Sequence, residues 1–264
     1  MRHPLTNPTF PRCDVTELFV SPTLLAIFFF VVSATYSSVG LGGGTSYTAL
    51  LAIFGAGHRS IPPISLTLNI VVTLMASINF VRGGHLRPSL VAAFVITSAP
   101  MAYLGGSLDV DARSFQLILI GLLIVVAARI YLWRRPAIDL PWSTGAKIAV
   151  SLFIGAIWGL VSGVVGIGGG IFLVPLIILL GLGDQKEAAA TGAVFILLNS
   201  TAALSAHAQR HMPPLSDIAP LVFAVIAGGF LGSYLSSEKL EKATIQKILG
   251  TIIVIAAVLL SLRL

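Results

Sequence analysis

Charged residues are scarce in this chain of 264 residues. They make up 10% of it, against roughly 25% in an ordinary soluble protein. No lysine, arginine, aspartate or glutamate occurs between Glu17 and Arg59, or between Lys147 and Asp184. Most of the remaining chain consists of further uncharged stretches near the length of about 20 residues that a helix needs to cross the hydrocarbon core of a bilayer. The sequence therefore predicts an all-α integral membrane protein and leaves no room for a soluble domain.

Cysteine is nearly absent too. The single Cys13 lies in the polar N-terminal tail, so neither an internal disulfide nor a two-cysteine metal site can form. The net charge of +6 would favour a nucleic acid partner in a soluble protein. Here the basic residues fall in loops, where they set the orientation of a membrane protein. We therefore expect the lipid bilayer, and no nucleic acid, around this chain.

Carboxylates are missing from the middle of every hydrophobic run. All ten acidic residues lie in tails, loops or helix ends: Asp14, Glu17, Asp109, Asp111, Asp139, Asp184, Glu187, Asp217, Glu238 and Glu241. Proton pumps and cation transporters usually carry buried acidic groups at membrane depth. Their absence here disfavours a cation as substrate and favours an anion held by neutral hydrogen-bond donors.

Catalytic motifs are lacking as well. The chain has no GxSxG elbow, no HExxH motif and no Walker lysine after a glycine-rich loop. His207 and His211 have the i, i+4 spacing of zinc ligands, but Ala208 stands where HExxH has its glutamate. We therefore expect no enzyme activity, no cofactor and no metal.

A glycine-rich motif occurs twice in the chain. Val39-Gly40-Leu41-Gly42-Gly43-Gly44 returns as Val165-Gly166-Ile167-Gly168-Gly169-Gly170, 126 residues later, and the same offset aligns His85 with His211. Such a shared register indicates duplication and predicts two homologous halves. We expect a polar N-terminal tail at 1–17, a first membrane repeat at 18–133, a cytoplasmic central loop at 134–146 and a second membrane repeat at 147–264.

Each half is expected to contain four full helices and one short, glycine-broken helix. The short arms at 45–58 and 171–183 have 14 and 13 residues, or about 20 Å of helix, against about 30 Å of hydrocarbon. If the arms do not cross, the protein has eight crossings and parallel halves; if they do, it has ten crossings and inverted halves. Lysine and arginine divide ten against six in both arrangements, so the charge rule does not choose between them. Both place the 82–87 loop and the central loop in the cytoplasm.

The two glycine motifs are our candidate binding site. Non-helical backbone at membrane depth is tolerated only where protein buries it or a cavity surrounds it, and a helix N-terminus offers free N–H groups and about half a positive charge. Two such ends facing each other would bind an anion, with side-chain donors nearby. The predicted substrate-binding residues are Gly42, Gly43, Gly44, Thr45, Ser46, Asn69, Thr73, Gly168, Gly169, Gly170, Thr191 and Asn199. The alternative is that the glycines only allow close helix packing.

One substitution is expected to separate these interpretations. If the glycines bind substrate, Gly169→Ser should abolish flux and leave expression and melting nearly intact. If they only pack helices, the fold should be lost together with the flux.

Basic groups at the helix ends are candidates for entrance or gating residues. Arg82 and His85 close one helix, and His207 and His211 close its partner, so each half places cationic or titratable groups at the same exit. These groups could recruit an anion and respond to pH, because histidine titrates at about 6.5. The alternative is that they anchor helix ends at the membrane interface.

The duplicated pattern resembles the sulfite exporter TauE/SafE family of bacterial membrane proteins. The resemblance is clearest where Gly-Ile-Gly-Gly-Gly-Ile-Phe-Leu-Val-Pro-Leu at 166–176 is followed by Ala-Ala-Ala-Thr at 188–191. It implies a multi-pass inner-membrane transporter of sulfite or an organosulfonate, with export as the favoured direction. The first arm departs from the pattern, because Ala49 stands at the place of Pro175.

These observations together predict an inner-membrane transporter of a small anion, sulfite or an organosulfonate. In the expected mechanism, one arm-bearing bundle rocks against the other around the paired helix breaks. Two other functions stay open: a passive anion channel, and a non-transporting membrane assembly or scaffold subunit. Assembly into a homo-oligomer also stays open.

Overall fold

The structure is a computed structural model that describes residues 21–39, 42–132, 143–210, 212–235 and 242–262. These residues form ten α-helices, of which two are short, α2 (Gly44–Ile53) and α7 (Gly170–Leu179). The expected all-α fold, with four full helices and one short helix in each half, is confirmed. The eight long helices are α1 (Pro22–Val39), α3 (Ile61–Arg82), α4 (Pro88–Ser107), α5 (Ala112–Leu132), α6 (Thr144–Val165), α8 (Gln185–Ala208), α9 (Leu215–Leu235) and α10 (Lys242–Ser261).

The short helices begin at the glycine motifs and end in the same way. Each has ten residues, or about 15 Å of helix, which is less than the 14 and 13 residues that we expected. Gly55 and Gly181 follow them in the left-handed region, with φ of 90° and 61°. Their N–H groups and those of the next residues bond back to the last helical turn, in the Schellman pattern. Neither arm is long enough to span a bilayer as a helix.

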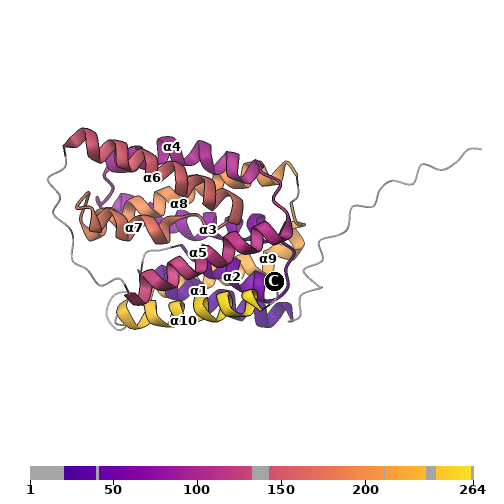
Figure 1. Cartoon of the computed structure of the whole chain (residues 1–264). Helices are drawn as coiled ribbons and strands as arrows, with labels where there is room; N and C mark the ends of the chain where they lie inside the picture. The colour runs from indigo at the N-terminus through magenta and orange to yellow at the C-terminus, as the bar shows by residue number, and fades with distance from the viewer. Residues whose placement is uncertain (1–20, 40–41, 133–142, 211, 236–241, 263–264) are drawn as a thin grey trace, which may run out of the picture.

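Glycines at every fourth residue hold together the two helix pairs that pack most extensively. Gly228 and Gly232 of α9 lie against the backbone of α1 at Phe30 and Ala34, so close that a side chain would collide there. In α6, the residues at 155, 159 and 163 are all glycine and lie in the same way against Phe94, Ser98 and Ala102 of α4. Residue numbers rise together along both pairs, which means that the paired helices run parallel. The first helix of each half therefore packs along the fourth helix of the other half (Figure 1).

This pairing shows that the two halves are inverted. α2 turns back beside α1, because Phe28 packs on Phe54 with ring centroids 5.6 Å apart while the Tyr36 hydroxyl lies 3.0 Å from that of Ser46. Successive helices then alternate in direction, so the first and fourth helices of one half point opposite ways. Because α6 is parallel to α4, α6 runs opposite to α1. Of the two arrangements left open by the sequence, the helix directions match the inverted one.

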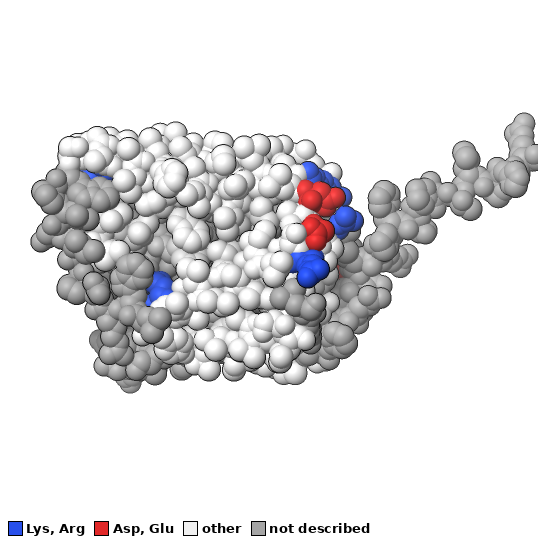
Figure 2. Space-filling view, in the orientation of Figure 1, with Lys and Arg blue, Asp and Glu red and all other residues white. Residues whose placement is uncertain are grey.

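The outer surface is suited to lipid. Large apolar side chains are exposed along the sides of the bundle, including Ile96, Phe153 and Phe223, which are 66%, 67% and 71% exposed. Charged groups gather toward the ends, and the middle of the face in Figure 2 carries none. Six of the described helices are long and apolar enough to cross a membrane. The chain is a multi-pass membrane protein.

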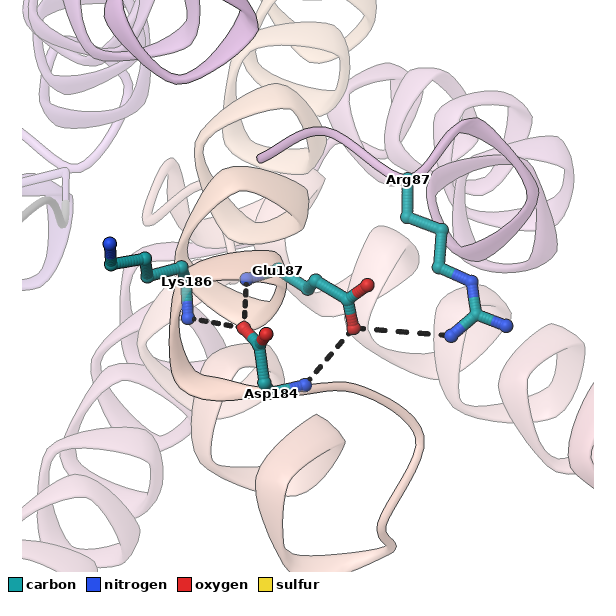
Figure 3. A network of polar contacts seen from close by, with 4 residues as sticks. All are labelled: Arg87, Asp184, Lys186 and Glu187. Carbon is teal, nitrogen blue, oxygen red and sulfur yellow. Dashed lines mark hydrogen bonds and ion pairs between the residues drawn. The ribbon is translucent and has the colours of Figure 1, made fainter. Parts of the chain in front are cut away.

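The end of the bundle where α4 and α8 begin carries a small polar network (Figure 3). Asp184 caps α8 by accepting hydrogen bonds from the backbone of Lys186 and Glu187, and the Glu187 carboxylate accepts one from the backbone of Asp184. Arg87, which precedes α4, forms an ion pair with Glu187 at 3.9 Å. Two parallel neighbours, α4 and α8, are thus joined where both begin.

Candidate functional site

The two short helices start from the same place in the centre of the bundle. Gly44, the first residue of α2, lies directly against the backbone carbonyl of Ile167 in the second glycine motif. Since the halves are inverted, α2 and α7 run away from this point in opposite directions. The positive ends of both helix dipoles therefore point toward one buried region.

The glycines of the second motif are required by conformation. Gly166, Gly168 and Gly169 have φ of 80°, 78° and 77°, a region that costs other residues roughly 1–2 kcal/mol each. In the first motif, Gly43 has φ of −83°, which any residue adopts. The two motifs are therefore related in sequence without having the same backbone shape.

The left-handed backbone changes our expectation for Gly169→Ser. Serine there would be strained, and its Cβ would lie 3.1 Å from the Phe195 ring. The expected near-intact melting is therefore wrong on physical grounds. Loss of flux in this variant would not separate binding from folding.

Asn69 of α3 lies where the two glycine motifs meet. Its amide fills the space into which a side chain on Gly44 would project, and its Nδ2 is 3.1 Å from where a Cβ on Gly168 would lie. The hydroxyl of Ser200 on α8 is 3.2 Å from that same Gly168 position. One amide and one hydroxyl from opposite halves thus converge beside both breaks.

These polar groups are buried without protein partners. Asn69 and Ser200 are 0% exposed, and neither amide atom of Asn69 nor the Ser200 hydroxyl has a hydrogen-bond partner within the described part of the chain. A buried polar group left unpaired costs roughly 1–3 kcal/mol. Such groups are rare in folded proteins and usually have a functional explanation. Their convergence beside both helix breaks makes this region the candidate site.

Ser65 ties the two motifs together. Its hydroxyl donates to the carbonyl of Gly166 at 2.8 Å, lies 3.3 Å from the carbonyl of Gly44, and accepts a bond from the Thr48 hydroxyl at 2.9 Å. Ser65 is four residues before Asn69, so both side chains lie on one face of α3. This face positions both breaks around the amide of Asn69.

The other residues that we predicted for the site divide into two groups. Those near the centre are Gly42, against the methyl group of Thr73, and Thr73 itself, whose hydroxyl donates to the Asn69 carbonyl at 2.6 Å. The others lie beside apolar groups or bond to residues outside the centre. Gly43 lies beside the Tyr47 ring, Gly169 beside Phe195 and Gly170 beside Ile196. Ser46 bonds to Tyr36, Asn199 bonds to Ser98 at 2.8 Å, and Thr45 and Thr191 are buried.

The structure thus brings Gly44, Asn69 and Gly168 together. The last two glycines of the second motif face apolar side chains instead. Ser98 and Ser200 are polar neighbours that our predicted site lacked. Ser200 is one hydroxyl among several on α8, and only its depth relative to Gly168 distinguishes it. The sequence offered no signal for Ser98.

The groups at the helix ends do not share an exit. α3 and α8 run antiparallel, so Arg82 and His85 lie at the opposite end of the bundle from His207, which corrects our expectation. His207 Nε2 lies 2.9 Å from the Gly163 carbonyl and joins α8 to α6. His211 lies outside the described residues. The contact of His207 favours its role as a packing group.

Comparisons with known proteins agree with this architecture. The family model described as "Sulfite exporter TauE/SafE" matches residues 25–260. The chain is 35% identical over 237 residues to the "Probable membrane transporter protein y4hK" of Sinorhizobium fredii, a match that covers 88% of this chain and 95% of that protein. No solved structure matches the chain.

Proposed function

This chain belongs to the sulfite exporter TauE/SafE family, as a multi-pass transporter of the bacterial inner membrane, and on that premise we propose that it carries a small oxyanion through the centre of the bundle. The proposed site lies between Gly44, Asn69 and Gly168. The observation that carries the proposal is the buried amide of Asn69, which has no hydrogen-bond partner among the described residues and adjoins both helix breaks.

An anion fits this site better than a cation or a neutral solute. Two helix N-termini direct their partial positive charge at it, and no described acidic residue lies within the helices at that depth. The family description supports sulfite as the substrate, and an organosulfonate presents a similar group of oxygens. Each oxygen can accept a hydrogen bond from a backbone N–H, from Asn69 Nδ2 or from Ser200.

Burial supports alternating access over a passive channel. Asn69, Gly44 and Gly168 are all buried, so the site is closed in this conformation and an anion reaches it only after helices move apart. The moving units are not the two sequence halves. One unit contains α4, α6, α7 and α8, which share an apolar cluster around Phe94, Leu173 and Phe195. The other contains α1, α2, α3 and α9, so each unit includes a helix from the other half.

Reconstitution tests the function directly. Purified protein in liposomes loaded with sulfite is expected to give saturable release that taurine-like sulfonates inhibit, with protein-free liposomes as the control. Release that rises linearly with concentration would instead support the channel. If liposomes with well-folded protein release no sulfur anion, the substrate assignment is refuted and the scaffold function is favoured. An imposed pH gradient identifies proton coupling in the same assay.

A further inference from the structure

A proline in α7 leaves one backbone carbonyl without its helical donor. In an α-helix the carbonyl of residue i accepts from the N–H of residue i+4, and proline has no N–H. Pro175 lies inside α7, four residues after Ile171. The carbonyl of Ile171, one residue beyond the glycine motif, therefore needs a donor from outside its own helix.

Arg129 supplies that donor. Its Nη1 donates to the Ile171 carbonyl at 3.2 Å, from the last turn of α5. The bond holds a partly buried guanidinium beside the first turn of α7, next to the glycine motif. Although Arg129 stands in the last turn of α5, the contact places its guanidinium close to the centre of the bundle, where α7 begins.

The equivalent contact between α2 and α10 has no counterpart of this pair. Ala49 stands at the place of Pro175, and Leu259 stands at the place of Arg129 when the last helices are aligned on their shared Gln-x-Ile-Leu pattern. The proline therefore occurs only in the second half and the arginine only in the first, and the two meet where α5 of one half contacts α7 of the other. This explains why the two arms differ in sequence.

The guanidinium is not neutralised by the described residues. The ion pairs there are Arg59 with Asp109 and Arg87 with Glu187, at the two ends of the bundle. Arginine has five N–H groups in a planar fork that matches the oxygens of an oxyanion, and one of them is used on Ile171. Arg129 is therefore a partly buried cation with further N–H donors, and it lies next to the helix-terminus site. This combination is suited to bind an anion.

We propose that Arg129 selects the transported anion by its charge, and that Pro175 serves to hold the guanidinium in place. This inference rests on the proposed transport function. The substrate class is a small sulfur oxyanion that binds Arg129 on the cytoplasmic side before it reaches Asn69. A lysine could neutralise the anion but would not match its planar pair of oxygens.

A double variant separates anion binding from packing. Arg129→Met removes both the charge and the donor to Ile171, whereas Pro175→Ala returns a helical N–H to that carbonyl. In the sulfite flux assay, Arg129→Met is expected to raise KM at least about tenfold and lower the melting temperature. Combining it with Pro175→Ala should restore melting and leave KM high. Pro175→Ala alone should raise KM several-fold, because the new N–H competes with the guanidinium for the carbonyl.

Two matched variants serve as controls. Arg113→Gln changes an exposed arginine at the other end of α5, and Pro220→Ala changes a proline inside α9; both should keep the wild-type KM. A double variant that recovers KM together with melting would overturn the inference, because Arg129 would then act only on the carbonyl. An unchanged KM in Arg129→Met would overturn it too while leaving the transport function intact. No flux by the wild type would overturn both proposals.

Discussion

Replacing Asn69 is expected to make the protein more stable and unable to transport. Asn69→Leu keeps the branch point at Cγ and removes two buried atoms that have no hydrogen-bond partner among the described residues. If the amide serves to bind a ligand, burying it unpaired destabilises the ligand-free protein, and this destabilisation disappears when the amide is removed. The donor that the anion needs disappears as well. Stability and flux should therefore change in opposite directions.

The size of the stability change follows from burial. The Asn69 side chain is 0% exposed, and unpaired polar groups in such positions cost roughly 1–3 kcal/mol. In a chain of this length, 1 kcal/mol shifts the melting temperature by about 2–4 °C. We expect a rise of at least about 2 °C. Leucine is larger than asparagine, and Gly44 lies close by, so Asn69→Ala provides a second variant that adds no volume.

The assay compares melting in detergent with sulfite flux in liposomes for the same preparations. Asn79→Leu is the matched control, because it changes an exposed asparagine near the end of the same helix and should alter neither quantity. Sulfite should raise the melting temperature of the wild type and not that of the Asn69 variants. A fall in melting for both Asn69→Leu and Asn69→Ala, with flux retained, would refute the reasoning, because the amide would then be structural.

Three further changes test other parts of the structure. Ser65→Ala removes the hydroxyl that bonds to both glycine motifs and should cost about 1–3 kcal/mol, measured as a lower melting temperature. Gly159→Val should cost at least about 1–3 kcal/mol by forcing α6 from α4, whereas Gly121→Val, which meets no atom within 4 Å, should be neutral by the same measurement. Burial, followed by the charge of Arg59, lowers the pKa of His58, so protonation favours the unfolded chain. Stability should fall as pH drops through about 6.5, and His58→Gln should weaken that fall.

The main features of the fold could be read from the sequence because they depend on local chemistry. Uncharged runs predicted the long helices, and consecutive glycines predicted where α2 and α7 begin. The ends of the arms were misjudged, since apolar residues continue to Ala56 while the Schellman turn at Gly55 has already ended the helix. The glycine that interrupts each apolar run, Gly55 in the first arm and Gly181 in the second, is the signal that would have placed those ends correctly.

The pairing between halves could not be derived from the glycine motifs alone. It depends on which glycine stripe fits which partner, and the four-residue spacing of Gly155, Gly159 and Gly163 shows only that α6 packs closely on something. Asn69 was predicted from its polarity at membrane depth. Its position beside both breaks depends on how α3 lies against two motifs from different halves, which one sequence does not specify.

The inverted pairing also constrains how such a chain could have arisen. A single half folds beside an upside-down copy of itself only if both copies enter the membrane, one in each orientation. An ancestor of half the present length would therefore have been a dual-topology protein, inserted both ways and assembled as an antiparallel dimer. Fusion of the two copies then fixed one orientation for each. From that point the first copy could keep Arg129 and the second copy Pro175, with no equivalent of either in the other copy, so that the two sides of the site came to differ.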